Sequence, residues 1–329
     1  MSDAMTGFEL YQPTDVEQAV DLIGRYGSRG WILTGGYDSL DWFKDRVKAP
    51  QAVIDIQGVA ELRGVRPTDG GGIEIGALTT LTEVTTSPTV RDRFRLLADA
   101  AGEVASPQIR NAGTLGGNLC QDTRCWYYRY GVDCYRAGGN TCYAAAPDAQ
   151  NREHAIFGAS RCVAVSPSDT APALVALDAE MVVLGAGGER VIRAEDFFME
   201  PAVDITRMTV LEPDELLVSV RIPSTWADAH FYFEKVADRN SWDFALASIA
   251  AAFKTDGVRV EDARIAFGAV QCTPRRMTRV EEWLRGRALT PEGVDAAAAL
   301  ASKGAQPLAY NEYKIPLVQN LVKRALRSV

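Results

Sequence analysis

Five of the six cysteines in this chain lie between positions 120 and 162, and this clustering constrains the fold of that region more than any other sequence feature. They are Cys120, Cys125, Cys134, Cys142 and Cys162. The residues between them are poor in aliphatic side chains, so this region cannot build a hydrophobic core of its own. Something else must order it, and thiolates bound to iron would do so.

The spacing of these cysteines does not identify a metal. Eight, seven and nineteen residues separate Cys125, Cys134, Cys142 and Cys162 in turn. Structural zinc sites usually contain tighter cysteine pairs, and bacterial ferredoxin motifs are also tighter. In a reducing compartment, clustered cysteines are metal ligands or catalytic groups more often than disulfides. A metal site and a group of mixed structural thiols both remain open, and the isolated Cys272 is interpreted as a structural thiol.

Two glycine-rich segments have the composition of phosphate-binding loops. One runs from Thr34 through Gly35 and Gly36 to Ser39, after a candidate strand, and the other covers 113–118 just before the cysteines. Glycine lets the backbone approach an anion closely, and successive N–H groups can surround phosphate oxygens. Neither segment fits the dinucleotide or Walker motifs, and each alone is compatible with an ordinary tight turn. Together they would clamp a pyrophosphate, with a third polar segment at 166–170.

Composition excludes several functional classes. The 329 residues are enough for two or three domains, with 47% hydrophobic and 24% charged residues. The net charge is −8 without a basic stripe, so nucleic acid is not an expected partner. No apolar run reaches the roughly 18 residues of a membrane span. Residues 1–6 lack the features of a secretory signal, so we expect a cytoplasmic location, or a periplasmic one only if a partner subunit carries an export signal.

Hydrophobic periodicity predicts a mixed α and β chain. The expected helices cover 14–26, with Thr14 as the cap, and about 91–104, 170–177, 244–253, 277–286 and 290–302, and two more begin at 82 and at about 315. The expected strands cover 31–33, 53–56, 73–77, 162–165, 181–184, 190–192, 231–235 and 258–269. We place the main domain boundary near residue 224.

The chain lacks an obvious acid–base site. His154 and His230 are its only histidines, and neither lies in a metal-binding or hydrolytic motif. We therefore assign no catalytic residue and expect the substrate to react on another polypeptide. The polar residues around Lys235, up to Asp243, are either a solvated edge or a contact with a cofactor ring.

Three segments resemble those of a known family. The run Thr34-Gly35-Gly36-Tyr37-Asp38 resembles its first pyrophosphate loop, with Tyr37 in place of the usual threonine; residues 109–119 resemble the second, and residues 166–179 a third. Over essentially its whole length, the chain resembles the FAD-binding subunit of molybdenum hydroxylases, the xanthine dehydrogenase group.

This resemblance implies an α+β fold. Residues 1–224 would form a two-subdomain FAD-binding domain of the vanillyl-alcohol-oxidase (PCMH) type, with a subdomain boundary near 58 and an insertion at about 120–162. Residues 225–329 would form a C-terminal antiparallel-sheet and helix domain of the CO-dehydrogenase flavoprotein type. The residues implied in FAD binding are Leu33, Thr34, Gly35, Gly36, Tyr37, Asp38, Ser39, Arg110, Asn111, Gly113, Thr114, Gly116, Gly117, Asn118, Ser168, Asp169 and Lys235.

The cysteine insertion resembles two branches of the family in which it holds a 4Fe–4S cluster. Residues 120–125 resemble the β subunit of 4-hydroxybenzoyl-CoA reductase, whereas 151–160, 238–246 and 311–314 resemble the flavin subunit of periplasmic aldehyde oxidoreductase. Carried over, the cluster ligands are Cys125, Cys134, Cys142 and Cys162, and Cys120 is a spare thiol near the flavin.

The implied function is electron transfer between FAD, this cluster and partner subunits. A molybdenum-cofactor large subunit and a 2Fe–2S small subunit would complete a heterotrimer or its dimer, acting on an aldehyde, aromatic or aroyl-CoA substrate. Two alternatives are a stand-alone FAD-dependent dehydrogenase or oxidase, and a zinc-stabilised scaffold subunit.

Overall fold

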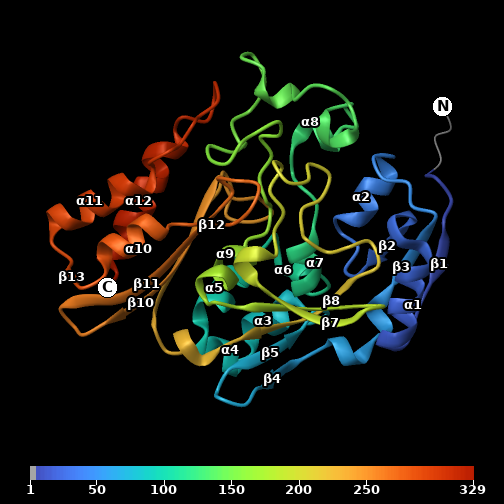
Figure 1. Ribbon diagram of the computed structural model, residues 1–329, viewed down its shortest axis with the longest axis horizontal. Helices are drawn as coiled ribbons and strands as arrows, with labels where there is room; N and C mark the ends of the chain where they lie inside the picture. Colours follow the sequence, from blue (N-terminus) through green and yellow to red (C-terminus); the bar gives the residue numbers. More distant parts are fainter. Residues whose placement is uncertain (1–4) are drawn as a thin grey trace.

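The computed structural model describes residues 5–329 (Figure 1). The first four residues of the amino-terminal segment, on which the expected location depended, lie outside this range. Among the helices within it, none combines the length and the apolar character that crossing a membrane requires.

A small parallel sheet begins the chain. It contains β1 (Glu9–Tyr11), β2 (Gly30–Leu33) and β3 (Ala52–Asp55) in the order β1-β3-β2, with α1 (Val16–Tyr26) and α2 (Ser39–Lys44) in the connections. The predicted first helix is confirmed, but its cap is Asp15, whose carboxylate accepts a hydrogen bond from the Gln18 backbone N–H. Asp15 has the extended backbone that an N-cap needs, so the helix starts one residue later than Thr14 would allow.

A five-stranded antiparallel sheet forms the centre of the first 225 residues. Its spatial order is β4 (Val65–Pro67), β5 (Ile73–Gly76), β8 (Leu216–Ile222), β6 (Glu180–Gly185) and β7 (Gly188–Arg193). Its helices are α3 (Leu81–Thr86), α4 (Pro88–Arg93), α5 (Arg95–Gly102), α6 (Pro107–Arg110), α7 (Leu115–Cys120) and α9 (Thr170–Ala176). The helix expected at 91–104 is two helices, because the backbone of the fully buried Phe94 leaves the helical region.

The cysteine insertion forms an irregular arm at the top of Figure 1. Its one α-helix is α8 (Trp126–Arg129), and extended segments and short turns make up the rest. The strand expected at 162–165 is wrong: these residues are buried, but within the described chain they join no sheet. Cys134 and Tyr128 pack against Trp42 of α2, so the first domain supplies part of the apolar surface that the arm lacks.

The C-terminal domain is an antiparallel sheet covered by three helices. Its strands are β9 (His230–Val236), β10 (Ala247–Thr255), β11 (Arg259–Gly268), β12 (Arg275–Arg276) and β13 (Arg287–Ala288); its helices are α10 (Thr278–Leu284), α11 (Pro291–Ala301) and α12 (Lys314–Arg327). Together the sheets and helices confirm the predicted α+β architecture.

The helix expected at 244–253 is wrong, because β10 occupies this stretch as a central strand. Ile249 and Phe253 face the core beneath α10–α12, whereas Ala250 and Ala252 face a second core shared with α5 and α9. A strand that is buried on both faces has apolar residues at every position, so the period of two is hidden in the sequence.

Candidate cofactor-binding site

One cavity of about 570 Å³ joins the two glycine-rich segments. Twelve of the residues expected to bind FAD line it: Thr34, Gly35, Gly36, Tyr37, Asp38, Ser39, Gly113, Thr114, Gly116, Gly117, Asn118 and Asp169. They come from the connection after β2, from α7 with the residues before it, and from the segment before α9. The tertiary structure thus brings both predicted loops to one cavity.

The two loops approach each other so closely that only glycine fits between them. A Cβ atom on Gly35 would lie 2.5 Å from the carbonyl oxygen of Ala112, and one on Gly117 would lie 2.7 Å from Thr34 Oγ1. The hydroxyl of Thr114 also donates to the Thr34 hydroxyl over 3.2 Å. These glycines therefore set the distance between the two sides of the cavity.

The first loop has donors suited to an anionic ligand. Within residues 5–329, the backbone N–H groups of Gly35, Gly36 and Tyr37 donate to no protein acceptor. Successive free N–H groups beside a cavity are the arrangement that binds phosphate oxygens. The cavity therefore suits an elongated molecule with a pyrophosphate, and a flavin dinucleotide is such a molecule.

Two predicted cofactor residues lie behind the cavity wall. Ser168 Oγ donates to Asn118 Oδ1 over 2.7 Å, and Lys235 Nζ lies 2.7 Å from Asp169 Oδ2. The Lys235 ammonium also donates to the carbonyl oxygens of Glu103 and Asp243. Both side chains are thus placed to orient a residue that faces the cavity.

Three other predicted residues do not line the cavity. Arg110 donates to the carbonyl of Val104 over 2.7 Å, and Asn111 accepts a hydrogen bond from Thr82. Leu33 packs in the apolar cluster around Trp42. These residues hold the second loop and the end of β2 in place.

The cysteine arm contributes cavity residues that sequence reasoning missed. Asp122, Arg129 and Arg136 line the cavity beside Cys120, which is exposed. Arg129 pairs with Asp38 of the first loop, and Arg136 pairs with Asp122 over 2.7 Å. The only sequence signal was the position of the arm directly after the second loop.

The four predicted cluster ligands are free thiols, and cysteines of this set influence one another electrostatically. The pKa of Cys125 is raised to about 12, chiefly by burial and less by the thiols of Cys162 and Cys142, while the backbone of Tyr128 and Tyr127 opposes the rise. Burial also raises the pKa of Cys162, and Cys142 and Cys134 add to this effect. Each thiol is thus within electrostatic reach of its neighbours.

These thiols do not form a site for a single ion. Among residues 5–329, no three cysteine, histidine or carboxylate side chains converge on a point that could hold one metal ion. A zinc ion needs such convergence, because its thiolate sulfurs bind at about 2.3 Å. In a four-iron cluster each thiolate binds a different iron, so the sulfurs need not meet at one point.

Cys272, which is isolated in the sequence, is close to the arm in space. Its thiol is buried 3.9 Å from the sulfur of Met208, and the pKa of Cys272 is raised chiefly by burial and secondly by Cys162. The fold therefore brings it near the predicted ligands, although nothing in its sequence context indicated this.

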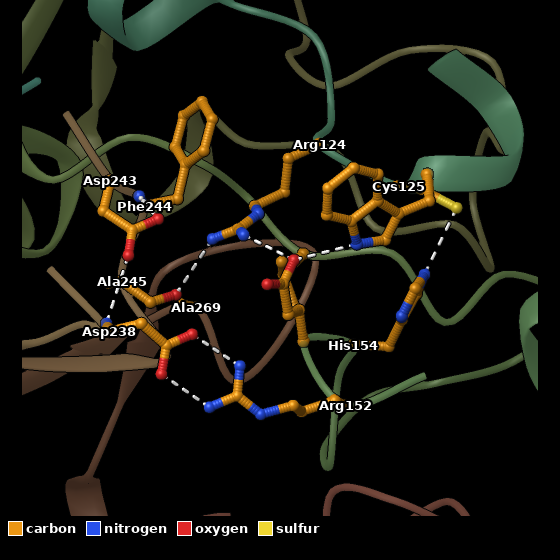
Figure 2. Close-up of polar contacts among 12 residues, drawn as sticks. Arg124, Cys125, Arg152, His154, Asp238, Asp243, Phe244, Ala245 and Ala269 are labelled. Atoms are coloured by element: carbon orange, nitrogen blue, oxygen red, sulfur yellow. Dashed lines mark hydrogen bonds and ion pairs between the residues drawn. The ribbon is translucent and has the colours of Figure 1, made fainter. Parts of the chain in front are cut away.

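A buried arginine joins the arm to the C-terminal domain. The Arg124 guanidinium donates to the Ala245 carbonyl over 3.3 Å and lies 4.6 Å from the ring centroid of Phe244 (Figure 2). It also pairs with Glu153, whose carboxylate accepts from the Trp126 indole. These contacts fix the residue next to Cys125 against the segment that precedes β10.

Lys314 is the most unusual charged residue of this region. Its side chain is fully buried, and its ammonium donates to the carbonyl oxygens of Glu153 and Ala269. Burial, with a smaller contribution from Arg124, lowers the pKa of Lys314 to about 7.

We expect this lysine to make stability depend on pH above neutrality. An unfolded lysine titrates near about 10.4, so between roughly pH 7 and 10 the unfolded chain binds the additional proton and stability rises by up to about 1.4 kcal/mol per pH unit. Urea unfolding across this range should show a smaller slope in Lys314→Met. Lys323→Met, a change in the same helix at a lysine paired with Asp295 on the surface, should keep the wild-type slope. Equal slopes in wild type and Lys314→Met would contradict the prediction.

Comparison with known proteins places the chain in a family. Residues 6–225 match the FAD binding domain in molybdopterin dehydrogenase, and residues 232–329 match the CO dehydrogenase flavoprotein C-terminal domain. A carbon monoxide dehydrogenase medium chain of Hydrogenophaga pseudoflava is 32% identical over 326 residues, covering 98% of this chain and 96% of the relative. An aldehyde oxidoreductase FAD-binding subunit of Escherichia coli K12 is 36% identical over 302 residues, covering 91% and 89%.

A solved structure agrees with this assignment. Carbon monoxide dehydrogenase from Hydrogenophaga pseudoflava, in a form that lacks the Mo-pyranopterin moiety, matches with a TM-score of 0.79 at 31% identity, covering 99% of this chain and 98% of that one. Fold and cavity together define a flavoprotein subunit of an oxidoreductase. The chain belongs to the molybdopterin dehydrogenase family, as an FAD-binding medium subunit of the carbon monoxide dehydrogenase and aldehyde oxidoreductase type. The iron–sulfur cluster stays a prediction.

Proposed function

We propose that this chain is the electron-relay subunit of a molybdenum-containing oxidoreductase, with FAD and a 4Fe–4S cluster as its cofactors. The observation that supports this most strongly is the single cavity shared by both glycine loops, with the cysteine arm forming part of its wall. When bound, FAD exchanges electrons in steps of one or two, which lets a two-electron reaction feed one-electron carriers.

The chain's own residues would bind and orient the flavin. In this proposal the free N–H groups of Gly35 and Gly36 hold the pyrophosphate, and Thr34 and Thr114 join the two loops. Asp169, fixed by Lys235, faces the same cavity. No acid–base pair is needed for this role.

The cysteine arm would hold the cluster close to the flavin. Cys125, Cys134, Cys142 and Cys162 are the proposed ligands, because all four thiols are free and lie near one another. The Asp38–Arg129 ion pair connects the first flavin loop to α8, four residues after Cys125. This contact would keep the arm that carries the proposed ligands next to the flavin loop.

Partner subunits would supply the rest of the complex. We propose a molybdenum-cofactor large subunit and a 2Fe–2S small subunit, in a heterotrimer or its dimer, with the substrate on the large subunit. The relatives act on carbon monoxide and on aldehydes according to their names, and an aldehyde, aromatic or aroyl-CoA substrate is proposed here. Isolating the complex from its native host and assaying these substrates identifies the class.

Metal analysis of the anaerobically purified protein tests the cluster. We expect about four iron and four acid-labile sulfide per chain, and Cys142→Ser should lose most of both. Cys120→Ser is the matched control and should keep them, since Cys120 is the proposed spare thiol. Cys272→Ser should also keep them, which tests whether its nearness to Cys162 makes it a ligand. Protein without iron and sulfide would exclude the cluster, and zinc in its place would favour the scaffold alternative.

A further inference from the structure

His154 lies against Cys125 with one ring nitrogen directed at the cysteine sulfur. The buried imidazole has Nε2 at 3.2 Å from Cys125 Sγ (Figure 2). Within the described residues, Nδ1 is buried and has no hydrogen-bond partner. A thiolate sulfur can only accept a hydrogen bond, so the contact at Nε2 requires the ring proton on that nitrogen. We therefore assign the proton to Nε2 when Cys125 is a thiolate.

We propose that His154 donates an N–H···S hydrogen bond to the Cys125 thiolate and thereby raises the reduction potential of the cluster. This inference rests on the proposed function, because it needs a cluster bound to Cys125. Reduction adds one electron to the cluster and neither makes nor breaks a bond to the protein. The added negative charge is shared by the sulfur ligands, so a donor at one of them stabilises the reduced form more than the oxidised form.

The position of His154 is fixed by a clamp from the C-terminal domain. The clamp consists of Asn311, Tyr313 and Lys314, which donate to the carbonyl oxygens of four successive residues, Arg152, Glu153, His154 and Ala155. Asn311 alone binds the carbonyls of His154 and Ala155, over 3.0 and 3.2 Å. The backbone that carries the imidazole is therefore held independently of the cysteines.

A second contact supports the same segment through the side chain of Arg152. Arg152 forms a two-pronged ion pair with Asp238, which lies in the loop after β9 (Figure 2). A segment held by several contacts keeps the imidazole in place when the charge on the sulfur changes, which favours a constant effect on the potential.

Main-chain groups of Tyr127 and Tyr128 also stabilise the thiolate form of Cys125, and a side-chain substitution does not remove them. Substitution of His154 is therefore the way to change how strongly the negative charge on the Cys125 sulfur is stabilised.

An EPR-monitored redox titration of the intact complex tests the proposal. We expect His154→Leu to keep its iron and sulfide and to lower the ratio of reduced to oxidised cluster about tenfold at a given applied potential, equivalent to about 59 mV for one electron. His154→Gln, which keeps an N–H donor, should recover part of this shift. His230→Leu is the matched control, because His230 is exposed and its ring is hydrogen-bonded to Ser328. This variant should leave the potential unchanged.

Weakening the clamp gives a second measurement. Asn311→Ala should lower the potential in the same direction by a smaller amount. Combined with His154→Leu, it should add little to the shift that His154→Leu causes alone, because both changes act on one hydrogen bond. A cluster whose potential is the same in wild type, His154→Leu and Asn311→Ala would overturn the proposal. If His154→Leu loses its cluster, the reduction potentials of His154→Gln and Asn311→Ala test the proposal instead, and wild-type values in both would overturn it. Wild-type protein without iron would instead refute the proposed function, so the two failures are distinguishable.

Discussion

Gly35→Ala is expected to lose its FAD. The added Cβ would lie 2.5 Å from the carbonyl oxygen of Ala112 and 2.9 Å from the Cα of Gly113. Both neighbours are backbone atoms and cannot rotate away, so the two loops must move apart. Since the proposed pyrophosphate contacts depend on this spacing, we expect at least tenfold weaker FAD binding, or about 1.4 kcal/mol. Flavin absorbance per chain after gel filtration, and titration of the apoprotein with FAD, measure the loss.

Gly24→Ala is the matched control. Gly24 lies in α1 of the same domain, and a Cβ there meets nothing within 4 Å. Alanine favours a helix over glycine, so this variant should bind FAD normally and be about 0.4–1 kcal/mol more stable. Full FAD content in Gly35→Ala would show that the distance between the loops does not determine flavin binding.

Lys235→Met is expected to destabilise the protein by about 3–5 kcal/mol, the usual cost of leaving one charge of a buried ion pair alone. The side chains of Lys235 and Asp169 are only 4% and 5% exposed. The ammonium also donates to the carbonyls of Glu103 and Asp243, and its bonds to Glu103 and Asp169 join the C-terminal domain to the first domain. Chemical unfolding at neutral pH measures the loss, and weaker FAD binding should accompany it.

The pH dependence of the stability of Lys235→Met should show that the unpaired Asp169 carboxylate causes the loss. Burial raises the pKa of Asp169 to about 6 although Lys235 lowers it, so removal of Lys235 raises this pKa further. In folded Lys235→Met, Asp169 then binds a proton at a pH where the unfolded chain has released it. The loss of stability relative to wild type should therefore shrink as the pH falls toward about 6. Near that pH the wild-type carboxylate also begins to bind a proton. Lys235→Met with Asp169→Asn should be more stable than Lys235→Met alone. Lys323→Met, whose partner Asp295 is 63% exposed, should cost less than about 1 kcal/mol. A deficit that is the same at all pH values would point to lost packing instead.

Much of the candidate site could be predicted because its residues are contiguous in the sequence. A glycine pair after a short apolar strand requires little context, since the conformational freedom and close approach of glycine are local properties. The cysteine cluster was equally visible, because the residues between the cysteines include few aliphatic side chains that could order the segment. The start of the helix expected at 290–302 was predictable for a similar reason. The Thr290 side chain accepts a hydrogen bond from the Gly293 backbone N–H, so the cap depends on nearby residues alone.

Other features depended on contacts between distant segments. Strand β10 was taken for a helix, because the two cores that bury its opposite faces are formed by helices remote in sequence. Asn311 and Lys314 were recognisable as a motif, but their target, the backbone carbonyls of 152–155, leaves no trace in the residue types there. The pairing of Asp38 with Arg129 was hidden for the same reason.

The sequence by itself determined which pieces this protein has: two glycine loops and a group of thiols without a core of their own. Only the tertiary structure decided that these pieces meet. Thr34 and Thr114 are 80 residues apart, yet they share a hydrogen bond, and Cys125 lies against a histidine held from the far end of the chain. The physical reason is that local residue types limit what a backbone segment can do, whereas the packing of the whole chain selects its neighbours.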